Sequence, residues 1–514
     1  MTAPDRPAAT ERRGDALLAA AIFTAALAWF AVQPHNLGPA DESYLLVEAR
    51  RVAGGERLYR DVFWFAMPAA HWLLAAVFAL WGASLTTAKL AVAVVNAGTA
   101  ALAFATARGL GVRRGLALLP PLAFLALAQP TWPHVSPHWL GTLLIMALFL
   151  IVAPPRALER PRRLLAAGLA LGALGAIHQQ KAPVLAIGLA AAILLASWLR
   201  RAAPGPAWWS RLGLAAAGTL AVIGPLLAVL FATVDAQRLL DDTVRFPLTG
   251  YRPLNDASWG QIGLLNVGLA AYTWPRLLRD LPLLLPLGAA AAAAGCARGW
   301  PRWRVAQWST ALLIGASALV AIGYNADFIH IAFMAAPLFV LAALLLDGAI
   351  ALLPPREQAA AGPLVAVALA LLLGTQMARN AIRMRAEYAV ATDTAFGRVD
   401  FHAPAEAAFS ARVAELLDAT PGRVLFVYPA YATLYLTAGG RNPTRHQLLV
   451  TGFNWPEHFA EVQAELEAQP AAVVAVLNGF VKPDDPFMDF VRQHFEVASE
   501  GQGWTIYQRR AAGQ

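Results

Sequence analysis

GPADESYLLVEARRVAGGERLYRD, residues 38–61, begins where a long apolar run ends, and it carries two adjacent carboxylates, Asp41 and Glu42. A charged side chain inside a bilayer costs roughly 2.5–3.5 kcal/mol on insertion scales, so the pair is expected outside the hydrocarbon. Two interpretations are open. The acids complement a solvated helix N-terminus, which is worth about 0.3–1 kcal/mol, or they hold a reacting group at the membrane face.

The composition indicates a polytopic membrane protein. Of the 514 residues, 58% are hydrophobic and only 14% are charged, whereas a soluble domain carries about 25% charged residues. The excess of 40 Lys and Arg over 32 Asp and Glu is expected of basic cytoplasmic loops, so no nucleic-acid partner is predicted. A single cysteine, Cys296, excludes an internal disulfide framework and a cysteine zinc site.

The apolar runs predict about eleven helices that cross the bilayer, within roughly ten to thirteen, because each crossing needs about 20 apolar residues. A shorter run, 69–82, contains His71 and is expected to lie on the membrane interface. With that choice every basic cluster falls on the side of the N-terminus, which the positive-inside rule makes cytoplasmic. The predicted spans are 16–33, 84–107, 115–130, 138–154, 164–179, 182–199, 211–232, 281–297, 305–324, 331–349 and 362–379.

The composition becomes ordinary in polarity after Arg379, which divides the chain into a membrane module, 1–379, and a C-terminal domain, 380–514. The first outer loop is expected at 34–83, and the C-terminal domain is expected on the same, outer side. Alternating strand and helix patterns predict a small α/β domain with a mostly parallel sheet. The predicted strands are 422–429, 471–478 and 503–510, and the predicted helices are 455–470 and 485–495.

The first outer loop carries a recognisable series of residues. After the acid pair come Gly55, Tyr59 and Asp61 in a G-x-x-x-Y-x-D pattern, then Pro68, and then an apolar helix that ends in Trp81-Gly82. This series resembles the opening of the GT-C superfamily glycosyltransferases that use polyprenyl-phosphate sugars. The closest branch holds the protein O-mannosyltransferases and lipid A aminoarabinose transferases, in glycosyltransferase family 39. One departure is Met67-Pro68, where many relatives have two prolines.

The resemblance implies a GT-C-like transmembrane module with an extracytoplasmic C-terminal domain, in the inner (cytoplasmic) membrane of a bacterium. It implies transfer of a monosaccharide from a polyprenyl-phosphate carrier to an envelope acceptor, which is a lipid, a glycan or a protein. An inverting transfer needs a carboxylate base for the acceptor's proton and cations near the departing phosphate. Position in the motif assigns Asp41 as the base and Glu42 as an orienting group or metal neighbour, with Tyr59 and Asp61 in the substrate site.

Candidates for the phosphate site lie in two other predicted outer loops. Lys181 stands between two apolar spans on the outer side, against the positive-inside trend, which favours a functional role over a snorkelling lysine. GT-C relatives often carry a Lys-Gln pair in this hairpin, and Gln180-Lys181 is a reversed match, so Lys181 is assigned to the lipid phosphate. In RFPLTGYRP, Arg245 and Arg252 flank Tyr251, and their guanidinium groups can bind phosphate with two parallel hydrogen bonds. The alternative is a solvated loop with a turn at Gly250, which explains the glycine and the prolines.

Asp327 and His330 lie three residues apart, on one face of a helix at its outer end, and are expected to shape the sugar or phosphate pocket. His134 and His138 come from another outer loop and are candidates for a divalent metal site, although such histidines also serve in hydrogen bonds. No cofactor is required by the pattern.

A transporter or flippase for a lipid-linked or small solute is the alternative function. It predicts charged or Gly/Pro-broken helices near the middle of the membrane, often in paired halves. Here the ionisable residues gather in the outer loops instead. A membrane-anchored scaffold would leave the acid pair and Lys181 without a role. The transferase is therefore the expected function, with the sugar and the acceptor left open.

Overall fold

The computed structural model describes residues 9–38, 41–199, 207–251, 274–323, 325–469, 471–501 and 503–510. Every predicted span falls on helical structure, although 115–130 is divided into short pieces around Pro120 and Pro121. Six helices of the described chain have both the length and the apolar composition to cross a membrane, so the full number of crossings stays a prediction. The helices at the predicted spans are α1 (Ala9–Ala31), α4 (Leu85–Gly109), α5 (Arg114–Ala117) with α6 (Leu119–Ala123) and η1 (Phe124–Ala128), α7 (Pro137–Val152), α8 (Pro161–Gly175), α9 (Lys181–Leu199), α10 (Trp208–Thr233), α14 (Leu284–Ala297), α15 (Arg302–Val320), α17 (Ala335–Ile350) and α18 (Pro355–Glu387).

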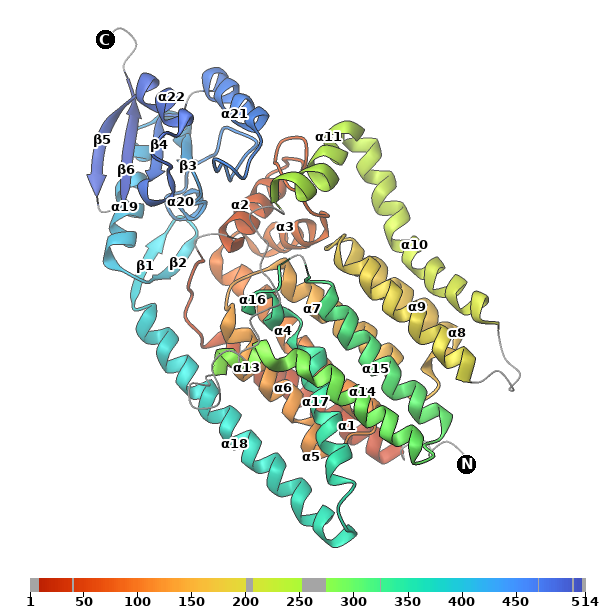
Figure 1. The fold of residues 1–514 in the computed structure, drawn as a ribbon. Helices are drawn as coiled ribbons and strands as arrows, with labels where there is room; N and C mark the ends of the chain where they lie inside the picture. The colour runs from red at the N-terminus through yellow and green to blue at the C-terminus, as the bar shows by residue number, and fades with distance from the viewer. Residues whose placement is uncertain are drawn as a thin grey trace.

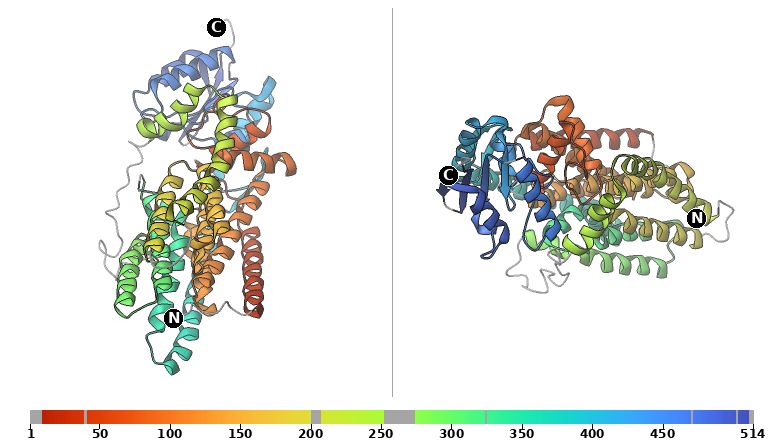
Figure 2. Two further views of the ribbon diagram at one scale, coloured as in Figure 1. Left: turned by 90° about the vertical axis from the view of Figure 1, so that its right-hand side faces the viewer. Right: turned by 90° about the horizontal axis from the view of Figure 1, so that it is seen from above.

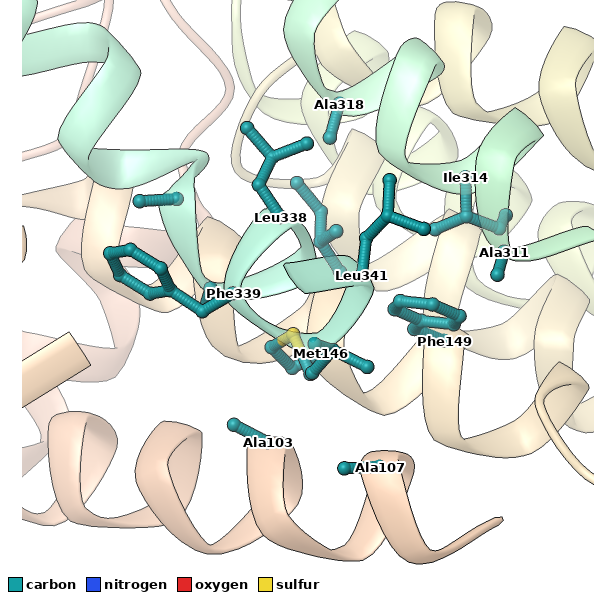
Figure 3. Packing of buried hydrophobic residues seen from close by; sticks show 14 of the residues in the cluster. Ala103, Ala107, Met146, Phe149, Ala311, Ile314, Ala318, Leu338, Phe339 and Leu341 are labelled. Carbon is teal, nitrogen blue, oxygen red and sulfur yellow. The ribbon is translucent and has the colours of Figure 1, made fainter. Parts of the chain in front are cut away.

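The centre of the bundle is an apolar cluster from α4, α7, α15 and α17. Alanines of α4 face the larger side chains of α7 and α17, as Figure 3 shows for Ala103, Ala107 and Met146. Because lipid tails are as apolar as these side chains, helix association in a membrane depends on close packing rather than on hydrophobic transfer. Small residues opposite large ones let the backbones approach, which explains the alanine-rich spans.

Helices α8 and α10 make the closest contact in the bundle through glycines. A Cβ atom at Gly168 would lie 2.0 Å from the carbonyl oxygen of Ala215, and one at Gly218 would lie 2.3 Å from that of Leu165. Both are far below any normal contact distance, so the two helices can pack in this way only without side chains at these positions.

The first outer loop lies at one end of the bundle, beside the C-terminal domain (Figures 1 and 2). It contains α2 (Asp41–Ala53) and α3 (Ala69–Trp81). The 13 residues of α3 span about 20 Å, which is short of the roughly 30 Å of hydrocarbon in a bilayer. Leu80 and Trp81 at its end are 72% and 70% exposed. These features suit the interfacial position predicted for this segment.

Helix α18 continues past residue 379 to Glu387, and the C-terminal domain follows it. A hairpin of β1 (Val390–Thr394) and β2 (Gly397–Phe401) precedes a four-stranded sheet in the order β3-β4-β6-β5. The strands of this sheet are β3 (Leu425–Tyr428), β4 (Val473–Leu477), β5 (Phe495–Gly501) and β6 (Trp504–Arg509), and its helices are α19 (Pro404–Asp418), α20 (Thr433–Thr437), α21 (Pro456–Ala468) and α22 (Pro486–His494).

The prediction of a mostly parallel sheet is wrong. Only β3 and β4 are parallel, and β6 runs antiparallel to both β4 and β5. The sequence prediction missed β5, which follows α22 directly and is separated from β6 by only two residues. A connection this short can join only antiparallel strands, since a parallel pair needs a long crossover.

The C-terminal domain shares a hydrophobic core with the first outer loop. Leu45 and Leu46 of α2 belong to the same buried cluster as Val427 of β3 and Leu434 of α20. A hydrogen bond of 2.7 Å also joins the hydroxyls of Ser43 and Thr433. The domain is therefore packed onto α2 and is not merely tethered by α18.

We expect Gly168→Ala to destabilise the protein by about 1–3 kcal/mol, because the added methyl group forces α8 and α10 apart. Thermal unfolding in detergent measures the effect. Gly224→Ala, on the same α10, is the matched control, because its Cβ would meet no atom within 4 Å. Equal melting temperatures for the two variants would show that the close contact is not needed.

Candidate active site

A cavity of about 810 Å³ lies between the outer-loop segments and the C-terminal domain. Its walls combine an aromatic and aliphatic surface with acidic, histidine and amide side chains, as expected of a ligand site. The segments around it come from both ends of the chain. Its polar and titratable lining residues are Asp41, Tyr44, Glu48, His71, Ser136, His138, His178, Gln179, Gln180, Thr243, Tyr251, Asn325, Asp327, His330 and Gln447.

Asp41, in the first turn of α2, lines this cavity and is exposed to it, and the cavity walls desolvate its carboxyl group. Burial raises the pKa of the Asp41 carboxyl above its usual 3.8, and the carboxylate of Asp327 adds to the rise, while His330 and His134 oppose it. Asp41 therefore has a greater affinity for a proton than an ordinary aspartate.

Glu42 is placed quite differently. It is fully buried and accepts hydrogen bonds from the backbone N–H groups of Gly38 and Val135, both at 2.6 Å. The Nζ of Lys89 lies 2.9 Å from it and the Nδ1 of His134 lies 3.1 Å from it. Burial opposes its ionisation, but Lys89 and His134 outweigh that effect and lower the pKa of Glu42 to about 2. Glu42 is thus a fixed anion, neither a solvated helix end nor a group that faces the described part of the cavity.

The two histidines suggested as metal ligands, His134 and His138, make different contacts. His134 binds Glu42, whereas His138 lines the cavity. Within the described residues no group of three or more His, Cys, Asp or Glu side chains is arranged to hold a metal ion.

Lys181 is fully buried at the start of α9, and its Nζ lies 2.6 Å from the Nδ1 of His138. Because a lysine ammonium only donates, the Nδ1 of His138 accepts and its proton resides on Nε2. The ring of His178 stacks on His138 at 4.7 Å, and its Nε2 donates to the carbonyl of Pro137 at 3.1 Å. Lys181 thus lies behind His138, and the neighbouring Gln180 lines the cavity.

Asp327 and His330 meet as their spacing predicted. Asp327 is the N-cap of α16 (Phe328–Phe333), and its Oδ1 accepts from the backbone N–H of His330 at 2.7 Å and from the Nδ1 of its ring at 2.9 Å. Burial opposes ionisation of Asp327, yet these bonds lower its pKa. The His330 ring lies 5.2 Å from that of His138, so both belong to one polar wall.

The motif residues Tyr59 and Asp61 lie behind the cavity. Tyr59 is fully buried with φ at 67°, and its hydroxyl donates to the carbonyl of Ala66 at 2.6 Å. Asp61 accepts from the backbone N–H of Arg57 at 2.9 Å and forms an ion pair with Arg60 at 2.7 Å. In the structure these two residues shape the loop that brings residues 63–71 to the cavity.

Of the three candidates in RFPLTGYRP, which are Arg245, Tyr251 and Arg252, the structure brings Tyr251 to the cavity. Tyr251 lines it and packs on Phe65 with ring centroids 5.0 Å apart. Arg245 is exposed, and its guanidinium lies 4.9 Å from the ring of Trp455. Arg252 lies outside the described residues.

Sequence reasoning missed three functional residues, Glu48, His71 and Lys89. Glu48 and His71 form a buried pair at 2.7 Å in the cavity wall, and Glu48 stands two helical turns after Asp41, a spacing that puts both on one face of α2. Lys89, the partner of Glu42, was missed as well. Its signal was present, because a lysine at the outer end of a span breaks the positive-inside trend just as Lys181 does.

We expect Glu42→Gln to destabilise the protein by roughly 3 kcal/mol at pH 7, the value that corresponds to lowering its pKa from 4.5 to about 2. This stability is present above pH 4.5 and is lost as the pH falls through 2. Denaturant unfolding of both proteins from pH 7 to pH 3 should therefore show their difference shrinking with acid. A difference independent of pH would mean that the carboxylate's charge is not what stabilises this site.

No protein-family model and no curated protein sequence matches the chain. Among solved structures, ArnT from Cupriavidus metallidurans bound to undecaprenyl phosphate is similar over 98% of this chain and 99% of its own, with a TM-score of 0.60 and 16% identity. The apo oligosaccharyltransferase of Archaeoglobus fulgidus is similar over 96% of this chain and 75% of its own, with a TM-score of 0.53 and 13% identity. The chain therefore shares the overall fold of these two structures over nearly its whole length, as the sequence led us to expect.

Proposed function

We propose that the protein is a membrane glycosyltransferase that moves a monosaccharide from a polyprenyl-phosphate carrier to an extracytoplasmic acceptor, with Asp41 as general base. The observation that supports it best is a carboxyl group of raised pKa in a large, partly apolar cavity. The cavity belongs to a fold in which ArnT holds undecaprenyl phosphate.

In this mechanism the Asp41 carboxylate takes the proton of the acceptor hydroxyl as its oxygen attacks the anomeric carbon. The bond between that carbon and the carrier's phosphate oxygen breaks, and the configuration inverts. A base is most effective when its pKa approaches the working pH, and burial raises the pKa of Asp41 towards that range. Glu42 acts by position, because its buried ion pair fixes the first turn of α2 that carries Asp41.

The departing phosphate needs hydrogen-bond donors, and the Nε2–H of His138 and the amide of Gln180 in the cavity wall are the candidates. Lys181 acts through His138, because its contact with Nδ1 leaves the Nε2–H of that ring as the donor. The aromatic part of the wall, including Trp64, Phe65 and Phe333, suits the sugar face or the start of the prenyl chain.

The distribution of charge supports an outer-face position for the cavity, in the bacterial inner membrane that the resemblance implies. Arginines gather at the opposite end of the bundle, where Arg108 and Arg114 pair with Asp15 and Arg113 pairs with Asp347. Basic residues mark the cytoplasmic side. With this end inside, the first outer loop and the C-terminal domain face the envelope acceptor (Figure 1).

We expect Asp41→Asn to lower transfer at least about 10²-fold, the least that a positioned base contributes. The assay uses proteoliposomes, a panel of radiolabelled polyprenyl-phosphate sugars and a bacterial envelope extract. Asp489→Asn, which changes an exposed carboxylate on α22 outside the described cavity lining, is the control and should keep near wild-type activity. In wild type the rate should fall with acid around a pH above 3.8. Full activity of folded Asp41→Asn would exclude Asp41 as the base.

We expect Lys181→Met to fold, because methionine is of similar volume and its apolar side chain avoids the cost of burying an amine group in the protein interior. Transfer should nevertheless fall by about 10-fold or more, the lower range for loss of a charged group that acts in the transition state. Melting temperature and initial rates are measured on the same preparation. A stable variant with unchanged rates would reduce Lys181 to a structural lysine.

A further inference from the structure

A second cavity, of about 320 Å³, lies between the end of α2 and the C-terminal domain. Four arginines line it: Arg50 and Arg51 from α2, and Arg423 and Arg441 from the domain. Glu56 is the one carboxylate among its described lining residues, so four positive charges less one negative charge leave a net charge of +3. We call this cavity the arginine pocket.

Two of the four guanidinium groups are neutralised locally. Arg51 forms an ion pair with Glu56 at 2.5 Å, and Arg423 forms one with Asp418. Arg50 and Arg441 have no carboxylate partner in the described part of the chain. Arg50 uses Nη2 alone, on the carbonyl oxygens of Tyr435 at 2.9 Å and Gly440 at 3.3 Å. Two positive charges therefore remain uncompensated in one pocket.

The position of a helix end explains only part of this arrangement. Cations near a helix C-terminus gain about 0.3–1 kcal/mol, which accounts for Arg50 and Arg51 in the last turn of α2. This helix-end effect does not account for Arg441, which comes from the C-terminal domain on the opposite wall of the pocket. Burial and the charge of Arg51 also lower the pKa of Arg50, as expected of a cation that lacks an anion.

We propose that the arginine pocket binds a phosphate group, carried by a lipid headgroup or by a soluble phosphate ester or pyrophosphate. Planar guanidinium groups grip phosphate oxygens in pairs, and the volume lies within the range of about 300–1,000 Å³ typical of small-ligand sites. The proposal does not depend on the proposed transfer reaction. The described lining of the 810 Å³ cavity contains no arginine or lysine, so the two sites differ in chemistry.

The arginine pocket is connected to the larger cavity through one side chain. The Nη1 of Arg51 donates to the Oε1 of Gln447 at 2.8 Å, and Gln447 lines the larger cavity. The two cavities use different residues of α2, since Asp41, Tyr44 and Glu48 line one and Val47, Arg50 and Arg51 line the other. A phosphate in the arginine pocket would thus anchor a molecule beside the reaction site.

Binding of radiolabelled inorganic pyrophosphate to the full-length protein in detergent tests the proposal at constant ionic strength. Wild type should bind saturably, and Arg441→Gln should raise the apparent Kd about tenfold, the usual cost of losing one charge-assisted contact. Arg441 is exposed, so the variant should fold, and its melting temperature checks this. Arg509→Gln, an exposed arginine on β6 of the same domain, is the matched control and should bind as wild type does.

A second arm uses nanodiscs of phosphatidylcholine with and without phosphatidic acid and measures the melting temperature. Stabilisation by phosphatidic acid that requires Arg441 would identify a lipid-borne phosphate, whereas binding of pyrophosphate alone would identify a soluble one, and either result supports the site. Asp41→Asn should bind as wild type does, which separates this result from any failure of the transfer assay. Absence of both effects, or equal effects in Arg441→Gln, would overturn the proposal.

Discussion

The buried carboxylate of Glu42 is the constraint on which the outer end of the molecule depends. Its contacts come from Gly38 before α2, Lys89 on α4, and His134 and Val135 in the loop before α7. A charge removed from water is tolerated only when its hydrogen bonds and ion pair are complete. These three segments must therefore converge on Glu42, and their convergence fixes the start of α2 at the cavity.

The position of α2 in turn determines where the C-terminal domain lies. Leu45 and Leu46 pack into the core of that domain, and Arg445 of the domain forms an ion pair with Asp242 in the helical segment after α10. The domain thereby brings Gln447 and Phe453 to the cavity wall. A cavity built in this way from both ends of the chain exists only when the membrane module and the domain are docked.

Features that depend on residues close together in the sequence could be predicted, whereas contacts between distant segments could not. Apolar runs located the helices because a membrane span must satisfy its own backbone and expose apolar side chains. Asp41, Asp327 and His330 were found because their motif and spacing are local, and all three line the cavity. The pairing of Lys89 with Glu42, the direction of β6 and the contact between Lys181 and His138 depend on segments far apart in the chain, so no local pattern gave these contacts, although Lys89 itself stood out by its place at the outer end of a span.

The two adjacent acids show how helix geometry assigns different chemistry to the same functional group. Successive residues of a helix point about 100° apart, so Asp41 faces the cavity when Glu42 faces Lys89 and His134. Burial without a close cation raises the pKa of Asp41, whereas the ion pair outweighs burial and lowers the pKa of Glu42 to about 2. Neighbouring acids driven apart in this way are a mark of divided roles. One can exchange a proton, and the other must stay charged to keep the first in place.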